Sequence, residues 1–276
     1  MTLREAYRYG QEQLKNAKVE DAELDAWYLL EFVTGISRAQ YFLDSEKQLS
    51  FEEEQEYLRN LKLRTEHIPL QHITGVQMFM GLEFKVNEHV LIPRQDTEVL
   101  VEKVLDVLQP GMQVLDMCTG SGCILLSLLH GKKDVTGVGV DLSEEALKVA
   151  KQNAESLEIE ATFLQSDLFA KVEGTYDLIV SNPPYIRTEV IEGLQEEVRM
   201  HDPRMALDGK EDGLYFYKKI IEKSPSYLKR SGRVYFEIGH DQGEDVKKLM
   251  EDAGFQEVTV KKDLAGLDRV VYGVYI

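Results

Sequence analysis

Four consecutive residues, Asn182, Pro183, Pro184 and Tyr185, end the apolar run "YDLIVS", which is typical of a buried strand. Proline has a fixed φ and no N–H, so neither proline can continue a hydrogen-bonded ladder, and Asn182 is held extended before them. The result is a stiff corner that carries a carboxamide, free backbone carbonyls and an aromatic ring. A simple rigid turn also explains this pattern, so the surrounding residues must decide what the corner does.

The second candidate site is a glycine-rich turn, "CTGSG", between the strand-like run "VLDM" and the helix-like run "CILLSLL". Gly120 and Gly122 permit tight backbone geometry and the close approach of a ligand. Asp141 ends the next strand-like run, where a carboxylate can accept hydrogen bonds from both hydroxyls of a ribose. Turn and acid together predict a nucleoside cofactor.

Strand-like and helix-like runs alternate through this half of the chain. The strand-like runs are "MQVLDM", "VTGVGVD", "ATFLQSD", "YDLIVSN" and "RVYFEIG", and the tail adds two more without a helix between them. Nearly continuous apolar strands separated by helices predict a doubly wound, mostly parallel α/β sheet, here of seven strands, with an antiparallel hairpin at its edge. Ligands bind such sheets at the carboxyl ends of the strands, where the glycine turn, Asp141 and the corner all lie.

The first 75 residues have a different periodicity. Apolar residues recur at helical spacing, for example at Ala22, Ala26, Leu29, Leu30 and Val33, and no strand pattern interrupts them. Residues 76–86 then alternate as a strand does, with Gly81 at the centre of a predicted hairpin. We expect a small all-helical domain over residues 1–75, a hairpin linker over 76–90 and the α/β domain over 91–276.

Composition narrows the function classes. The 276 residues are 43% hydrophobic, and their net charge of −17 argues against broad electrostatic binding to nucleic acid. The first residues lack the apolar core of a signal peptide, and no run approaches the roughly 20 apolar residues of a membrane span. Cys118 and Cys123 are the only cysteines, and their spacing suits neither a disulfide framework nor a metal site. These features predict a reduced, cytoplasmic protein without a metal.

The glycine turn resembles that of class I S-adenosylmethionine methyltransferases, whose usual pattern is (D/E)-x-G-x-G-x-G, with Asp116 as its acid. Cys118 stands where the first glycine is usual, and we expect a negative φ there and a side chain that points away from the cofactor. Asp167 ends the third strand, where these enzymes hold the adenine amino group, although a helix cap would also explain it. The resemblance implies cofactor contacts from Arg94, Thr97, Cys118, Thr119, Gly120, Ser121, Gly122, Asp141, Asp167, Leu168 and Asn182.

With that cofactor, the corner acquires a chemical role. The nitrogen lone pair of an amide or ring-conjugated NH2 is delocalised, so a methyl-transfer site must orient the two N–H bonds and aim the lone pair at the methyl group. The Asn182 side-chain oxygen and the Pro183 carbonyl are each able to accept one N–H. Tyr185 is expected to pack on the planar group. The corner is therefore predicted to hold a planar NH2.

The whole chain resembles the protein-(glutamine-N5) methyltransferases that modify peptide chain release factors, the HemK/PrmC family. The matching segments are the helical domain, "PLQHITG", "LIPRQDTE", the glycine turn, "SNPPYI", "DPRMAL" and "DRVVYG". The resemblance implies methyl transfer to the glutamine of the Gly-Gly-Gln loop in release factors, which the helical domain would dock. It also places Arg94 and Thr97 at the lip of the cofactor pocket, although a helix start explains these two residues as well.

Two other functions are compatible with the same motifs. An N6-adenine or N4-cytosine methyltransferase would use the corner on a flipped base, against which the acidic composition counts. A non-catalytic nucleotide-binding protein would need no paired amide acceptors. The acceptor of the methyl group distinguishes these functions. Transfer to free release factor supports the first, transfer to DNA supports the nucleic-acid enzyme, and transfer to neither supports the binding protein.

Overall fold

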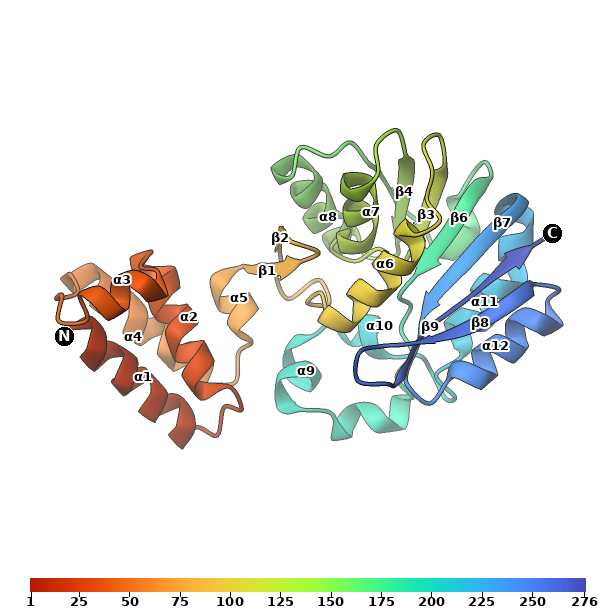
Figure 1. Cartoon of the computed structure of the whole chain (residues 1–276). Coiled ribbons are helices and arrows are strands. Elements are labelled where there is room, and N and C mark those ends of the chain that lie inside the picture. Colours follow the sequence, from red (N-terminus) through yellow and green to blue (C-terminus); the bar gives the residue numbers. More distant parts are fainter. The chain divides into compact units, whose positions relative to one another are not determined.

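The computed structural model describes residues 1–276 and divides into two compact units (Figure 1). The first comprises Met1–Val76 and Gln195–His201, and the second Gln77–Leu194 and Asp202–Ile276. The sequence predicts one domain over residues 91–276, whereas the segment Gln195–His201 packs with the first unit. There the buried Arg64 forms ion pairs with both Asp25 and Glu197. No local periodicity encodes such a contact between distant residues.

The first unit is helical, as predicted. It contains α1 (Leu3–Asn16), α2 (Ala22–Thr34), α3 (Arg38–Leu43), α4 (Phe51–Thr65), α5 (Leu70–Thr74) and α9 (Glu196–His201). Thr2, Ser37 and Ser50 start α1, α3 and α4 with capping boxes, in which the cap hydroxyl and a Glu or Gln side chain satisfy backbone N–H groups that the helix leaves free. Trp27 and Tyr57 are buried at the centre of the core.

The predicted hairpin is present as β1 (Val76–Phe79) and β2 (Leu82–Lys85). Its two-residue loop, Met80 and Gly81, has positive φ at both positions, +51° and +74°. That backbone is the type I′ turn, whose twist matches that of the paired strands.

The second unit is built on a seven-stranded sheet in the order β5-β4-β3-β6-β7-β9-β8. Its strands are β3 (Gln113–Met117), β4 (Thr136–Asp141), β5 (Thr162–Gln165), β6 (Tyr176–Ser181), β7 (Leu228–Glu237), β8 (Gln256–Lys262) and β9 (Asp268–Tyr275). The strands from β5 to β7 are parallel, whereas β9 runs antiparallel to β7 and β8. The predicted doubly wound sheet and its antiparallel edge are therefore confirmed.

Helices cover both faces of the sheet (Figure 1). On one face Val114 and Leu178 pack with α6 (Glu98–Leu105), α7 (Cys123–Gly131) and α8 (Glu144–Ser156). On the other face Leu115 and Ile179 pack with α11 (Tyr215–Lys223) and α12 (Gly243–Asp252). Neighbouring strand residues thus enter different cores, which is why these strands are apolar throughout.

Short helices complete the second unit. They are η1 (Gln95–Thr97), η2 (Leu168–Lys171), η3 (Thr188–Gly193), α10 (Arg204–Leu207) and η4 (Ser224–Tyr227). Neither unit contains a helix with the length and apolar character that crossing a membrane requires.

Candidate active site

A cavity of about 340 Å³ opens at the carboxyl ends of the central strands. The chain winds outward from β3 through β4 to β5 on one side, and through β6 to β7 on the other, so the strand order reverses between β3 and β6. Ligands of doubly wound sheets bind at this point of reversal. The glycine turn follows β3 and the corner follows β6. Because the register of these parallel strands places Met117 beside Ser181, the two predicted elements lie next to each other.

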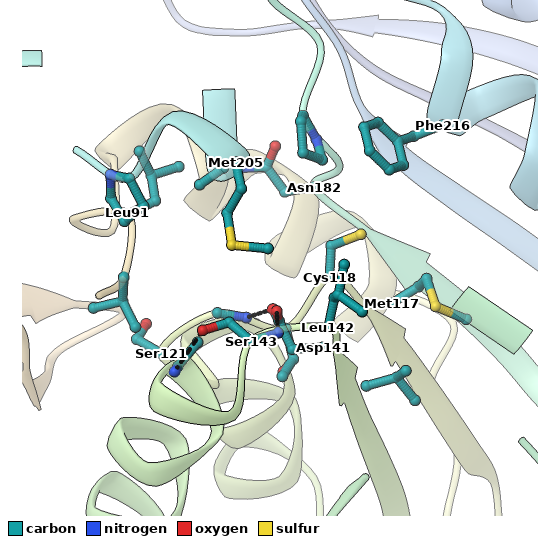
Figure 2. A pocket seen from close by; sticks show the side chains of 18 of the residues that line it. Leu91, Met117, Cys118, Ser121, Asp141, Leu142, Ser143, Asn182, Met205 and Phe216 are labelled. Atoms are coloured by element: carbon teal, nitrogen blue, oxygen red, sulfur yellow. Dashed lines mark hydrogen bonds between the residues drawn. The ribbon is translucent and has the colours of Figure 1, made fainter. Parts of the chain in front are cut away.

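Figure 2 shows how the labelled side chains surround the cavity. Asn182, Met205 and Phe216 gather on one side, Asp141 and Ser143 lie on the other, and Cys118 stands between them. The lining therefore combines apolar and sulfur-containing side chains with a few polar groups, as small-molecule sites generally do.

Cys118 does not have the backbone conformation that the sequence predicts. Its φ is +62°, in the left-handed region; the residue lines the cavity and also packs against the hydrophobic core. The expectation of a negative φ is therefore wrong, whereas a thiol that points away from the methionine tail stays a prediction. The turn needs a left-handed residue at this position to redirect the chain from β3, which explains why glycine is the usual occupant. Burial raises the pKa of the Cys118 thiol, so it stays protonated near neutrality.

The two glycines of the turn have different structural roles. Gly120 has a φ of +53°, and a Cβ built on it would meet no protein atom within 4 Å, so its backbone is open to the cavity. At Gly122, with a φ of +79°, a Cβ would come within 3.2 Å of Ala150. Gly120 lines the cavity, whereas Gly122 does not. Gly122 thus allows helix α7 to pack closely against its neighbours.

Asp141 is fixed at the end of β4 by two backbone donors. Its Oδ2 accepts a hydrogen bond from Gly120 N and its Oδ1 from Ser143 N, each at 2.9 Å (Figure 2). Burial raises the pKa of the Asp141 carboxyl and these backbone hydrogen bonds oppose that rise. Each carboxylate oxygen keeps a second lone pair, so the oriented carboxylate still has the capacity to accept two ribose hydroxyls.

Beneath the turn, Asp116 is fully buried and accepts a hydrogen bond from the Thr119 hydroxyl at 2.5 Å. Burial raises the pKa of Asp116 to about 7, and the Thr119 hydrogen bond opposes that rise. Asp116 does not line the cavity. It supports the turn through Thr119, which does line it.

The remaining predicted cofactor residues lie around the rim. Asp167 precedes η2 but makes no side-chain cap hydrogen bond, and both it and Leu168 line the cavity. Asp167 is thus the N-cap residue of η2, but its carboxylate makes no capping hydrogen bond. Arg94 lines the cavity and donates a hydrogen bond to Asp202 at 2.6 Å. This pair ties the segment before α6 to the segment that leads into α10.

Of the corner residues, Asn182 and Pro184 line the cavity, whereas Pro183 and Tyr185 do not. The Asn182 Nδ2 donates to the Thr97 Oγ1 at 3.4 Å. The Tyr185 hydroxyl instead donates to Glu237 at 3.4 Å. The expected packing of Tyr185 on a planar group stays a prediction.

Sequence reasoning missed several residues at this site. Met205 of α10 and Tyr215 and Phe216 of α11 line the cavity. Met205 lies in the segment "DPRMAL" but was not singled out there, and the two aromatic residues lie outside every motif quoted above. Glu237 was missed despite an available signal, because it ends an apolar parallel strand as Asp141 does.

The chain matches two family models, "PrmC N-terminal domain" over residues 5–75 and "Methyltransferase small domain" over residues 95–199. The release factor glutamine methyltransferase of Caulobacter vibrioides is 40% identical over 99% of this chain and 96% of its own length. The enzyme of the same name from Geobacter sulfurreducens is 39% identical, with the same coverage.

Among solved structures, a methyltransferase from Pyrococcus furiosus matches with a TM-score of 0.53. It is 18% identical and aligns over 71% of this chain and 90% of its own, which supports the methyltransferase fold. The two full-length relatives match the sequence across both units. By these similarities, the chain belongs to the release factor glutamine methyltransferase family.

Proposed function

We propose that this protein transfers a methyl group from S-adenosylmethionine to the side-chain amide nitrogen, N5, of the glutamine in the Gly-Gly-Gln loop of peptide chain release factors. The observation that carries the proposal is the position of Asn182, whose carboxamide lines the cavity with its Nδ2 on Thr97. Its Oδ1 then remains to accept an N–H from a planar amide. The identities with full-length release factor glutamine methyltransferases support this choice of acceptor.

The residues present fit S-adenosylmethionine. The backbone at Gly120 leaves open space beside the turn, and Asp141 and Asp167 offer carboxylates at the ends of adjacent strands. We expect Asp141 to accept the ribose hydroxyls, Asp167 to accept the adenine amino group, and residues 118–121 to contact the methionine tail. When bound, this cofactor supplies an electrophilic methyl group on a sulfonium.

The protein's contribution to the transfer is orientation. An amide nitrogen attacks poorly unless its lone pair points at the methyl carbon within a short distance. By accepting the two N–H bonds, the Asn182 Oδ1 and the Pro183 carbonyl would fix the plane of the acceptor amide. The Pro183 carbonyl is free for this role, since it accepts no backbone hydrogen bond. Such contacts strengthen as positive charge develops on the nitrogen, so they lower the barrier rather than only improving binding.

The helical unit is proposed to dock the release factor. On α2, Leu24, Tyr28 and Phe32 recur every four residues and lie on one face, and each is more than 40% exposed. A row of exposed apolar side chains is a feature of interaction surfaces. We place the activity in the cytoplasm, where release factors act in translation.

The docking proposal is tested by the double substitution Tyr28→Ala/Phe32→Ala. It should raise the KM for release factor several-fold and leave the dissociation constant of S-adenosylmethionine unchanged. Leu264→Ala, which removes a fully exposed leucine of the second unit, is the matched control. An unchanged KM in the double variant would contradict a docking role for this face of α2.

The reaction itself is tested with methyl-labelled S-adenosylmethionine and three acceptors: a purified release factor, the same factor with its Gly-Gly-Gln glutamine replaced by alanine, and duplex DNA. Label is expected on the first alone, and mass spectrometry should place it on the glutamine. Label on DNA would establish the nucleic-acid alternative. Cofactor binding without transfer to any of the three would refute the proposed reaction.

A further inference from the structure

A buried glutamine holds the chain where it leaves the corner. Gln242 directly precedes α12, is 2% exposed and does not line the cavity. Its side-chain Nε2 donates hydrogen bonds to the backbone carbonyls of Tyr185, at 3.0 Å, and Gly213, at 3.2 Å. Its Oε1 accepts a hydrogen bond from Gly239 N at 2.9 Å. Both N–H bonds of the Gln242 amide are therefore used, and three separate segments meet at one side chain.

The orientation of this amide and the position of its backbone are both fixed. If the amide were turned over, its oxygen would face two carbonyl oxygens and its NH2 would face the Gly239 N–H, so only one orientation forms the three hydrogen bonds. The backbone N–H of Gln242 donates to Gly239 O at 2.9 Å, and its carbonyl accepts from Val246 N at 3.0 Å as α12 begins. The side chain therefore reaches the corner from a helix start that is held on both sides.

The corner cannot fix its own direction. Its two prolines have a fixed φ, but their ψ angles can still vary, and neither proline has an N–H with which to bond its surroundings. Before the corner, the Ser181 hydroxyl donates to Met117 O at 2.6 Å and ties β6 to β3. After the corner, the Tyr185 carbonyl accepts the hydrogen bond from Gln242. The direction in which the corner faces the cavity therefore depends on both attachments.

The same amide also holds the chain that leads into α11. Gly213 lies shortly before Phe216 of α11, which lines the cavity. A Cβ built on Gly213 would lie 2.5 Å from Tyr185 O and 2.6 Å from Gln242 Nε2, so a side chain there would push these segments apart. Figure 2 shows Asn182 and Phe216 on the same side of the cavity. Gln242 thus sets the distance between the corner and the start of α11.

We propose that Gln242 is a positioning residue for methyl transfer, which holds the corner at a fixed distance from the start of α11. An acceptor amide bound by Asn182 and the Pro183 carbonyl then has a single orientation. The proposal rests on the function proposed above. The side-chain hydrogen bonds of Gln242 all go to backbone atoms, so it acts on the geometry of the site without touching cofactor or acceptor.

The first test is Gln242→Glu, a change of nearly identical shape in which an ionised carboxylate has no N–H to donate. The Tyr185 and Gly213 carbonyls then lose their donor, while the hydrogen bond from Gly239 N is kept. We expect kcat to fall about tenfold or more, since a displacement of about 1 Å at a reacting group costs up to about a hundredfold. The dissociation constant of S-adenosylmethionine should not change, and the KM for release factor should change much less than kcat. Gln256→Glu, which adds the same charge at an exposed position of β8, is the control.

Gln242→Met tests the same loss without an added charge. Methionine has a similar length and no N–H, so kcat should fall by a similar factor. In both variants the backbone hydrogen bonds of Ile186 with Leu207 and Gly209 remain, so the fold should persist, which circular dichroism checks. A wild-type kcat in both variants would overturn the proposal, as would a loss that appears only in the KM.

Gly213→Ala disturbs the same contacts and leaves Gln242 in place. Its methyl group would press on Tyr185 O and on Gln242 Nε2, so kcat should fall about as much as in Gln242→Met. Gly174→Ala is the matched control, because Gly174 also has a positive φ, +82° against +73°, but a Cβ there meets no atom within 4 Å. If both alanine variants lower kcat equally, backbone strain explains the loss and the proposal fails. This pair decides the question should the Gln242 variants fail to fold.

A double variant tests whether Gln242 acts through the corner. In Asn182→Ala/Gln242→Met the losses in kcat should be less than additive, because much of the effect of Gln242 is exerted through the placement of Asn182. Fully additive losses would mean that the two residues act independently, which would overturn the proposal.

Another readout needs no substrate. The side-chain NH2 resonances of Asn182, assigned by their absence in Asn182→Ala, should shift in Gln242→Met and in Gly213→Ala relative to the wild type. In Gly174→Ala they should stay in place. If the wild type fails to methylate release factor, the proposed function fails, while these resonances still decide whether Gln242 positions the corner. Unchanged Asn182 resonances in Gln242→Met and Gly213→Ala would overturn the inference.

Discussion

Replacing the buried Glu237 by glutamine should stabilise the fold at alkaline pH. Burial of the charged form raises the pKa of Glu237 from 4.5 to about 7. A folded state that holds a proton more tightly than the unfolded chain loses stability as the pH rises between those two values. Above pH 7 the native protein carries a buried charge that the glutamine variant lacks.

The size of this effect follows from the shift. Each pKa unit corresponds to about 1.4 kcal/mol, so a rise from 4.5 to about 7 corresponds to at most about 3.5 kcal/mol. The free energy of unfolding of Glu237→Gln should thus exceed that of the wild type by up to this amount at pH 8. The gain should shrink through pH 7 to 5 and vanish below pH 4.5. Arg269 keeps Asp96 and Asp263 as partners in the variant, so no cation is stranded.

Urea unfolding at several pH values measures this difference. Circular dichroism is the suitable probe, because Trp27, the single tryptophan, lies in the first unit and does not report on β7. Glu222→Gln, at an exposed glutamate of α11, is the control for loss of one exposed acid. The quantity to compare is the free energy of unfolding of Glu237→Gln minus that of the wild type. If this difference is smaller at pH 8 than at pH 5, the reasoning is refuted.

Three further substitutions have defined outcomes. Asn182→Ala should lower kcat about a hundredfold or more while cofactor affinity, measured by calorimetry, changes little; a wild-type rate would contradict its orienting role. Asp141→Ala should weaken cofactor binding by ~1.5–3 kcal/mol through loss of hydrogen bonds to a charged acceptor, and unchanged affinity would remove Asp141 from the site. Cys118→Gly should be more stable to urea than Cys118→Ala by about 1 kcal/mol, since glycine accepts positive φ without strain; the opposite order would contradict the +62° φ of Cys118.

Much of the fold could be predicted because the signals are local. The helices of the first unit follow from apolar spacing and from capping residues such as Thr2 and Ser50, and the hairpin turn follows from Gly81 within alternating residues. The parallel sheet follows from apolar strands alternating with helices. Asp141 and Asn182 could be placed at one edge because parallel strands end at the same edge.

Other features depend on contacts between distant residues. The packing of Gln195–His201 with the first unit depends on Arg64 finding Glu197 across the chain. The place of Glu237 beside Asn182 depends on the register of two parallel strands, and the hydrogen bond between Asn182 and Thr97 depends on where a short helix places Thr97. Sequence patterns carry no information on such pairings.

The sequence by itself determined the architecture, the cofactor class and the place of Asn182, the residue proposed to orient the acceptor amide. Periodicity, proline stereochemistry and the conformational freedom of glycine act within a few residues of the chain. They can therefore be recognised from residue types and their spacing. Only the tertiary structure decided the backbone of Cys118, the partner of Tyr185 and the burial of Glu237. These depend on which side chains are excluded from water together, and that is fixed when the sheet and its helices pack.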